Sequence, residues 1–198
     1  MPTVRTRPSK PALPEFALTA AQRRYDPERR SRIIRATLDV IAEHGVAGTT
    51  HRRVAAAADV PLGSMTYHFA SLDALLLEAF THLADAVANG FEERLGACAT
   101  ADAACEAVVD LVVDARWVGP RALLLSYELY ALAARNPPMR AVMRRWMGRS
   151  RAALERHFAP EAAKVLDAMI EGLLIHRSVD PQPMDRAQVR ALVDRLAR

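Results

Sequence analysis

The sequence predicts an all-α fold of about nine helices, and three observations support this prediction. Alanine, the residue with the highest helix propensity, supplies 38 of the 198 residues. Apolar residues recur at intervals of three and four between breaks at glycine and proline, as they do in amphipathic helices. No stretch alternates apolar and polar residues in the manner of a half-buried strand.

The composition is that of a soluble globular protein, with 51% hydrophobic and 25% charged residues. No uncharged apolar run approaches the roughly 18 residues of a membrane-spanning helix. No apolar stretch follows Arg5, Arg7 and Lys10, as it would in a secretory signal. We therefore expect a cytoplasmic protein without a membrane partner, in which Cys98 and Cys105 serve as small buried or half-buried hydrophobic side chains.

Charge is unevenly distributed along the chain, although the formal net charge is only +4. Residues 1–53 hold 11 basic and 5 acidic side chains, whereas residues 71–115 hold 1 basic and 9 acidic ones. Residues 116–177 again hold 11 basic and 5 acidic side chains. A basic N-terminal end favours a polyanionic partner at that end, and a solvated charged face is the alternative.

The N-terminal segment should contain an arm followed by a helix. Residues 1–25 contain four prolines and little periodicity, so we expect a flexible arm there. The first helix should begin after Asp26, a suitable N-cap, with Pro27 at its first position. Gly45 should end this helix, because glycine adopts the left-handed conformation common at helix C-termini.

Two short helices should follow, and then a long one. Thr50 should cap the first short helix, which runs to about Ala58. A turn at residues 59–61 leads to the second, which ends near Tyr67, and Ser71 should cap the long helix. Later breaks delimit five further helices, at about residues 102–117, 123–135, 139–158, 160–177 and 185–196.

The most informative stretch is residues 49–69, where two short helices joined by a tight turn follow a longer helix. This arrangement is typical of a helix-turn-helix, although a plain helical hairpin has the same pattern. The alanines at 55–58 allow the two helices to approach closely, and Val60 can fill the gap between them. The second helix would present to a major groove the residues Gly63, Ser64, Thr66 and Tyr67.

Residues 29–80 resemble the N-terminal domain of the tetracycline-repressor (TetR) family of bacterial transcription regulators. The resemblance rests on the order and spacing of Arg32-Ile33-Ile34, Ala36, Ile41-Ala42-Glu43, Gly45, Thr50, Arg52, Val54-Ala55, Ala58, Val60, Gly63, Tyr67-His68-Phe69, Ser71 and Leu75-Leu76. It covers about a quarter of the chain, and the rest is similar to the family only in the number and length of its helices. The resemblance implies a three-helix DNA-binding domain followed by a larger helical domain for ligand binding and dimerisation.

The resemblance also implies which residues contact DNA: Thr50, Arg52, Arg53, Gly63, Ser64, Thr66, Tyr67 and His68. Thr50 would cap its helix and contact a phosphate. Ser64 and Thr66 would face the bases. Tyr67 and His68 would hold phosphates on the strand beside the groove.

The chain departs from the family pattern at four positions. Asp59 stands where glycine is usual, and the turn should survive because aspartate tolerates the left-handed backbone better than most residues. Thr66 stands where an aromatic residue is common, which should alter base preference. Leu62 and Leu72 stand where lysine is frequent, so two phosphate contacts should be missing or made by backbone amides at helix N-termini.

A candidate effector site lies in the middle helices, where aromatic and sulfur-containing side chains occur beside two charged ones. Its candidate residues are Trp117, Tyr127, Glu128, Tyr130, Met143, Arg144 and Met147. An apolar cavity with a few polar groups is typical of a ligand site. The same residues at helical spacing are also typical of a core, which is the alternative.

The last two predicted helices each carry a wide apolar face, which favours a dimer interface. The candidate interface residues are Leu166, Met169, Ile170, Leu173, Leu174, Val189, Leu192, Val193 and Leu196. Burial of these faces within a single chain is the alternative.

The expected function is that of a DNA-binding transcriptional regulator. The sequence contains no P-loop, dinucleotide-binding glycine pattern, H-E-x-x-H or G-x-S-x-G, so we do not expect an enzyme. Its histidines are scattered without ligand spacing, so we expect no metal and no cofactor. Residues 26–70 would bind a palindromic operator on double-stranded DNA. Residues 71–198 would form the homodimer and bind a small-molecule effector that releases the repressor.

An alternative function belongs to another class of protein. The chain could be a helical ligand-binding or protein-interaction module that has lost DNA binding. The replacement of lysine by Leu62 and Leu72 favours this alternative.

Overall fold

The computed structural model describes residues 26–114 and 116–197, which contain nine helices and no strand. The predicted all-α fold is therefore confirmed. The helices are α2 (Arg29–His44), α3 (His51–Ala57), α4 (Gly63–His68), α5 (Leu72–Gly96), α6 (Ala101–Val113), α7 (Pro120–Ala133), α8 (Pro137–Leu154), α9 (Pro160–Val179) and α10 (Arg186–Leu196). None of these helices is both long and apolar enough to cross a membrane. The arm expected at residues 1–25 lies outside the described residues.

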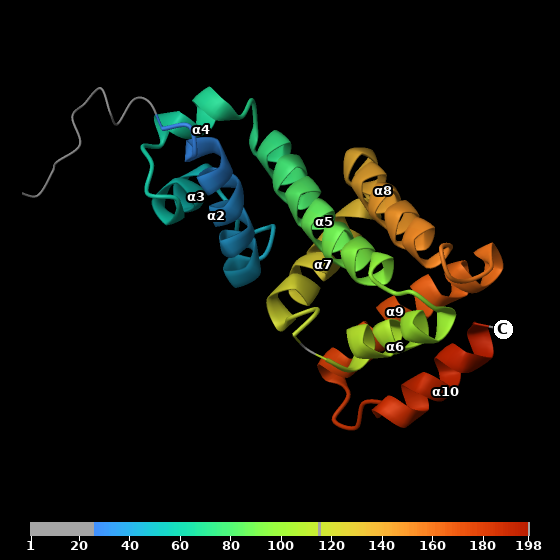
Figure 1. The fold of residues 1–198 in the computed structure, drawn as a ribbon. Helices are drawn as coiled ribbons and strands as arrows, with labels where there is room; N and C mark the ends of the chain where they lie inside the picture. The colour runs from blue at the N-terminus through green and yellow to red at the C-terminus, as the bar shows by residue number, and fades with distance from the viewer. Residues whose placement is uncertain (1–25, 115, 198) are drawn as a thin grey trace, which may run out of the picture.

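Helices α2, α3 and α4 gather at one end of the molecule, and the C-terminus lies at the other (Figure 1). A small core joins the three helices to the start of α5. Its fully buried members are Ile33, Val54, Met65 and Leu75. Phe69 is also buried in this core.

Local sequence signals set the boundaries of these helices. The Thr50 hydroxyl accepts a hydrogen bond from the Arg53 backbone N–H at 3.3 Å, and the Ser71 hydroxyl accepts one from the Ala74 N–H at 3.1 Å. Both predicted N-caps are therefore confirmed. Gly45 ends α2 with a φ of 68°, as predicted.

The start of α2 differs from the prediction, because Asp26 is not its N-cap. The helix begins at Arg29, and no side chain caps it. The Asp26 carboxylate instead accepts hydrogen bonds from the Glu28 N–H at 3.1 Å and from Arg32 Nη2 at 2.6 Å. A carboxylate bound to a guanidinium forms a strong charge-assisted bond, which takes this side chain away from the capping position.

The turn between α3 and α4 has the backbone conformation that the sequence predicted. Asp59 has a φ of 50° and is the residue other than glycine with a positive φ in the described chain. Its N–H donates to Ala56 O at 3.2 Å, and the Val60 N–H donates to Ala55 O at 3.0 Å. These two bonds form a Schellman motif, which satisfies the last carbonyls of α3 and fixes the angle at which α4 leaves.

We expect Asp59→Gly to raise the free energy of unfolding by up to about 1 kcal/mol, because glycine adopts a positive φ without steric cost. Asp59→Ala should lower the free energy of unfolding, because alanine has the same steric conflict and no polar side chain. Urea denaturation of both variants measures the two changes. A glycine variant no more stable than the alanine variant would contradict this account of the turn.

Helix α5 connects the DNA-binding end to the rest of the molecule. Its buried residues Leu76, Phe80 and Leu83 pack with α2, α7 and α8 in a second core. Helix α8 runs beside α5 (Figure 1), and Arg149 of α8 binds Glu92 of α5 at 2.6 Å. Helix α5 therefore belongs to both the N-terminal and the C-terminal packing.

Helices α6, α9 and α10 form most of a third core, together with the ends of α5 and α8. Ion pairs connect α10 to α6. Arg186 binds Glu106 at 2.7 Å, and Arg190 binds Asp102 at 2.5 Å. Cys105 is buried here, as expected of a small hydrophobic side chain. Cys98 is half-buried, and both thiols are free.

Candidate DNA-binding surface and effector cavity

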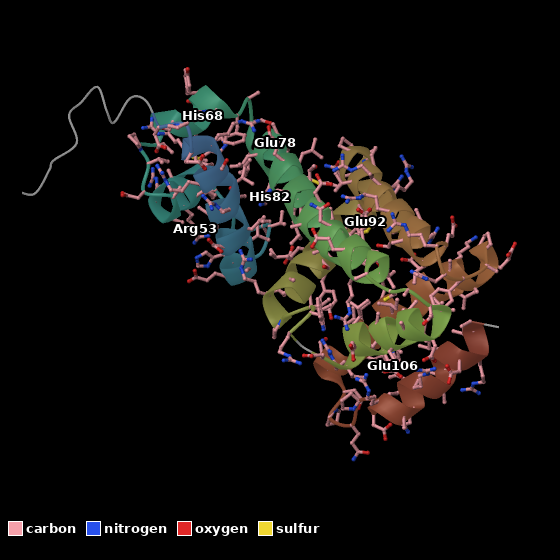
Figure 2. The ribbon with its side chains drawn as sticks, viewed as in Figure 1. Arg53, His68, Glu78, His82, Glu92 and Glu106 are labelled. Carbon is pink, nitrogen blue, oxygen red and sulfur yellow. The ribbon has the colours of Figure 1, made fainter. Side chains whose placement is uncertain are left out.

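The residues predicted to contact DNA lie on α3 and α4, except Thr50, which directly precedes α3. Tyr67 is 85% exposed. Thr50, Arg52, Arg53, Gly63 and Thr66 are also exposed, whereas Ser64 and His68 are half-buried. Figure 2 labels Arg53 and His68, which lie at the same end of the molecule. The fold therefore brings all eight residues to one end, on the two short helices of the helix-turn-helix.

The two arginines of α3 differ in their freedom to reach DNA. Arg53 donates a short hydrogen bond through Nη1 to the carbonyl of Gly48, so its guanidinium is held against the loop before α3. Within the described residues the Arg52 side chain makes no hydrogen bond or ion pair, and it is exposed. Arg52 is thus the cation of this surface that can extend to a phosphate or a base edge without breaking an internal contact.

Helix α4 offers hydroxyl and imidazole groups and no cation. A side chain at Gly63 would meet no atom within 4 Å, so the N-terminal end of this helix is open. Leu62 directly before it is 52% exposed. A recognition helix of this composition can approach DNA closely and form hydrogen bonds with it, but it adds little positive charge to the surface.

His68 contributes a neutral ring rather than a positive charge. Burial, with the charges of Arg29 and Arg30, holds the pKa of His68 below its usual value, although Asp26 opposes the shift. Its ring meets Tyr67 edge-on, with the centroids 5.0 Å apart. A neutral imidazole can still donate one N–H to a phosphate oxygen.

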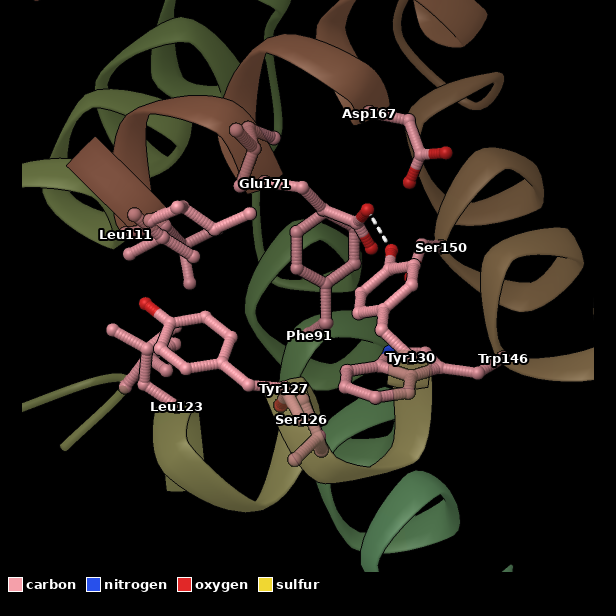
Figure 3. Close-up of a pocket in the computed structure, with 15 residues that line it drawn as sticks. Phe91, Leu111, Leu123, Ser126, Tyr127, Tyr130, Trp146, Ser150, Asp167 and Glu171 are labelled. Carbon is pink, nitrogen blue, oxygen red and sulfur yellow. Dashed lines mark hydrogen bonds between the residues drawn. The ribbon is translucent and has the colours of Figure 1, made fainter. Parts of the chain in front are cut away.

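A cavity lies between the helices of the C-terminal part. None of its lining residues belongs to the predicted DNA-contact residues. The centres of water-sized spheres can occupy about 80 Å³ of the cavity, and its empty space reaches about 730 Å³ only when the part open to solvent is included. Helices α5 to α9 supply its walls, and most lining side chains are apolar or aromatic (Figure 3). The lining includes Phe91, Leu111, Leu123, Tyr127, Tyr130, Trp146, Asp167, Ile170, Glu171 and Leu174.

Two carboxylates of α9 approach this cavity, and their surroundings differ. Asp167 is 4% exposed and accepts a hydrogen bond from Arg151 Nε at 2.8 Å. Glu171 accepts a hydrogen bond from the Tyr130 hydroxyl, drawn as a dashed line in Figure 3. Burial raises the pKa of both carboxyl groups, and the hydrogen bonds from Arg151 and Tyr130 act in the opposite direction. The cavity thus contains one carboxylate paired with an arginine and one hydrogen-bonded to a phenol.

Of the seven residues predicted for an effector pocket, Tyr127 and Tyr130 line this cavity. Trp117 lies outside it, with the Arg94 guanidinium 3.8 Å from its ring centroid. Glu128 points to the DNA-binding end, where its Oε2 accepts a hydrogen bond from the Val46 N–H at 3.4 Å. The other three lie on α8: Met143 is buried in the second core, Met147 packs against that core, and Arg144 is exposed.

Sequence reasoning missed the polar wall of the cavity. Asp167 and Glu171 occur four residues apart within the stretch 166–174, whose apolar residues were predicted to form a dimer interface. Acidic residues on an otherwise apolar helix face are costly to bury, so they signal a polar function there. This pair was the sequence signal that could have located the cavity on α9.

The residues predicted for a dimer interface divide into two groups. One group is buried within the chain itself: Leu166, Ile170, Leu174, Val189 and Val193. The other group is half-buried: Met169, Leu173, Leu192 and Leu196. A different stripe of α9 is exposed around Val165, which is 48% exposed. A groove between α9 and α10 continues this stripe and is lined by Val165, Ala168, Met169, Leu192, Arg195 and Leu196. Ile175 is 40% exposed but lines the cavity.

Comparison with known families matches both parts of the chain. A family model described as bacterial regulatory proteins of the tetR family matches residues 33–79, which contain α3 and α4. A second, described as the C-terminal domain of tetracyclin repressor-like proteins, matches residues 99–198, half of the chain. The chain belongs to the TetR family.

Individual proteins are similar to most of the chain. SCO7518 of Streptomyces coelicolor A3(2) is 50% identical, with 86% of this chain and 99% of SCO7518 covered and a TM-score of 0.81. The multidrug binding protein EbrR, complexed with ethidium, is 35% identical, with 87% and 99% covered and a TM-score of 0.72. The HTH-type transcriptional regulator BetI 1 of Chromohalobacter salexigens is 29% identical over 178 residues, which are 84% of this chain and 87% of BetI 1.

The family identifies the general activity of the chain. TetR-family relatives are DNA-binding transcriptional regulators and not enzymes. This protein is therefore a DNA-binding regulator with a helix-turn-helix in its N-terminal part and a helical C-terminal domain.

Proposed function

We propose that this TetR-family regulator represses transcription as a homodimer that binds a palindromic operator and leaves it when a small molecule occupies the cavity. Residues 26–70 form the DNA-binding unit, residues 71–198 bind the effector and dimerise, and residues 1–25 act as a basic arm. The observation that carries the proposal is the position of α7. This helix lines the cavity with one face and contacts α2 with another.

The contacts of α7 suggest how ligand binding reaches the DNA-binding helices. Tyr127 and Tyr130 face the cavity. On the other side Leu125 and Leu129 belong to the same core as residues of α2, and Arg121 binds Asp39 of α2 at 2.5 Å. A ligand that presses on the cavity face of α7 therefore moves this helix against α2, on which α3 is packed. Packed helices shift as rigid units, so this displacement changes the placement of α4.

A homodimer supplies the second recognition helix that a specific operator needs. One helix-turn-helix contacts few bases, whereas two related by a two-fold axis read half-sites about one helical turn apart. The exposed apolar stripe of α9 and the groove beside α10 offer a self-complementary surface for this pairing. A change in the distance between the two α4 helices would then remove the match to the operator.

The structural relatives support a small-molecule effector. EbrR is described as a multidrug binding protein, and its structures contain ethidium, proflavin and malachite green. These EbrR structures are 32–38% identical to this chain and cover at least 85% of it. We therefore assign the effector site of this regulator to the cavity between α5 and α9.

The DNA-binding part of the proposal is tested on sites selected by the wild-type protein from random DNA. We expect Arg52→Ala and Tyr67→Ala each to weaken binding by about 1–3 kcal/mol, because both remove exposed groups that can reach the groove or the phosphates. Fluorescence anisotropy of labelled duplexes measures the affinities. Arg144→Ala is the matched control, because it removes the same charge from an exposed position on α8.

One alternative function is favoured by a specific observation. Leu62, which is exposed before α4, and Leu72, at the start of α5, stand where lysine is frequent in the family. The surface that would face DNA therefore has two fewer positive charges than the family pattern. The same experiment separates the two functions. Failure of the wild-type protein to select any DNA sequence would favour a ligand-binding or protein-interaction module instead of a regulator that binds operators.

A further inference from the structure

The cavity contains one carboxylate that has no basic partner among the described residues. Glu171 of α9 faces Tyr130 of α7, whose hydroxyl donates a hydrogen bond to it (Figure 3). Asp167 lies one turn earlier on α9, but the guanidinium of Arg151 neutralises it from α8. Glu171 is therefore the group in the cavity that a ligand of opposite charge can still pair with.

The rest of the lining favours the same kind of ligand. Four aromatic rings surround the space around Glu171: Phe91 of α5, Tyr127 and Tyr130 of α7, and Trp146 of α8. The faces of aromatic rings attract cations, and this attraction strengthens when water is excluded. An anion would instead face the carboxylate directly, and a neutral molecule would bury it without a counter-charge.

We propose that the cavity selects an organic cation bearing aromatic or branched apolar groups, with the Glu171 carboxylate as its counter-charge and Tyr130 holding that carboxylate in place. This inference rests on the proposed function, because it names the chemical class of the effector for the same site. It assigns Glu171 to ligand binding and leaves Asp167 with a structural role.

Proton release should accompany binding at pH values near or below the raised pKa of Glu171. Burial raises the pKa of Glu171, and Asp167 adds to this shift, whereas Tyr130 and Arg151 oppose it. The other walls nearest to it contribute no charge, since α5 supplies Val87 and Phe91 and α6 supplies Leu111. A bound cation stabilises the carboxylate and so lowers its pKa, which expels a proton. Affinity for the cation should therefore fall as the pH is lowered through the raised pKa of Glu171.

The charge preference is tested with ions of nearly equal size and shape. Tetraphenylphosphonium and tetraphenylborate carry opposite charges, and triphenylphosphine oxide is a neutral comparison. Isothermal titration calorimetry on the full chain at pH 7.5 should show tetraphenylphosphonium binding at least about 100-fold more tightly than tetraphenylborate, a difference of about 2.8 kcal/mol. Equal binding of the two ions, or no binding of tetraphenylphosphonium, overturns the proposal.

The role of Glu171 is tested with Glu171→Gln, which removes the charge and keeps an oxygen that can accept the Tyr130 hydrogen bond. We expect at least about a tenfold loss of affinity for tetraphenylphosphonium and no loss for triphenylphosphine oxide. Titrations in buffers with different ionisation enthalpies should show that proton release disappears in this variant. Glu161→Gln is the control, because it removes an exposed carboxylate from the same helix. An equal loss for both ligands would indicate a merely structural role and overturn the assignment.

A DNA-release assay distinguishes failure of this inference from failure of the proposed function. Triphenylphosphine oxide or tetraphenylborate that binds as tightly as the cation and releases the operator would overturn the charge preference and leave the proposed function in place. Tetraphenylphosphonium that binds through Glu171 without releasing the operator would support the inference and contradict release by cavity ligands.

Discussion

Replacing Arg151 with methionine should lower the free energy of unfolding by about 3 kcal/mol at pH 7. The change leaves Asp167 buried without its guanidinium partner, and an uncompensated buried charge is strongly destabilising. Methionine keeps much of the apolar stem of arginine, so the loss reports mainly the missing charge. The loss cannot greatly exceed about 4 kcal/mol, because protonating a carboxyl of ordinary pKa at pH 7 costs about that much.

The loss should depend on pH in a defined direction. Burial already raises the pKa of Asp167, although Arg151 lowers it, and removal of Arg151 raises it further. A group whose pKa is raised on folding binds more protons in the native state, so stability falls as the pH rises through the raised pKa. The Arg151→Met variant should therefore differ most from wild type at neutral pH. The difference should shrink as the pH falls toward the ordinary aspartate pKa of about 3.9, below which the carboxyl is protonated in both the folded and the unfolded state.

Urea denaturation at pH 7 and pH 5 measures this effect. Arg144→Met is the matched control, because Arg144 is exposed on the same helix. Its small effect should be the same at both pH values. The double variant Arg151→Met/Asp167→Asn should recover much of the stability, since the amide carries no charge. A loss in Arg151→Met that is independent of pH would contradict a charge-based role.

Replacing Val165 with glutamate should convert the proposed homodimer to monomers and reduce affinity for the selected DNA sites by about 100-fold or more. Val165 is 48% exposed within the chain, so its replacement leaves the folded monomer nearly unaffected. In a two-fold dimer the new carboxylate occurs twice in one interface, where it is buried without a partner at a cost of several kcal/mol. Each 1.4 kcal/mol corresponds to a tenfold change in the association constant.

Sedimentation velocity measures the oligomeric state, and circular dichroism checks that the helices persist. Leu192→Glu should act in the same way from the α10 side of the groove. Ala141→Glu is the control, because it places the same carboxylate on an exposed position of α8. A Val165→Glu protein that remains dimeric would place the interface on another surface.

Features that depend on neighbouring residues were predicted well from the sequence. Thr50 and Ser71 cap their helices because a hydroxyl reaches a backbone N–H three residues later. The left-handed Asp59 was predicted from the family resemblance, in which glycine is usual at this position. Asp26 is the exception, because a bond to Arg32, six residues away, competes with the local cap.

The cavity could not be predicted in the same way, because its walls come from five helices. Tyr127 and Glu128 are neighbours in the sequence, yet one faces the cavity and the other faces the loop after α2. A helix turns by about 100° per residue, so adjacent side chains meet different partners. Composition alone therefore located the region of the site, and the packing of α7 selected its members.

Helix α9 shows where sequence information ends. The sequence predicted a helix with an apolar face over residues 160–177, and the structure has it over Pro160–Val179, because the period of apolar residues and Pro160 at the first position are local properties. Only the packing decided that Leu166, Ile170 and Leu174 face the chain's own core while Val165 and Ile175 remain exposed. Periodicity reports that a face is apolar but not what covers it, since burial is equally favourable against any apolar surface.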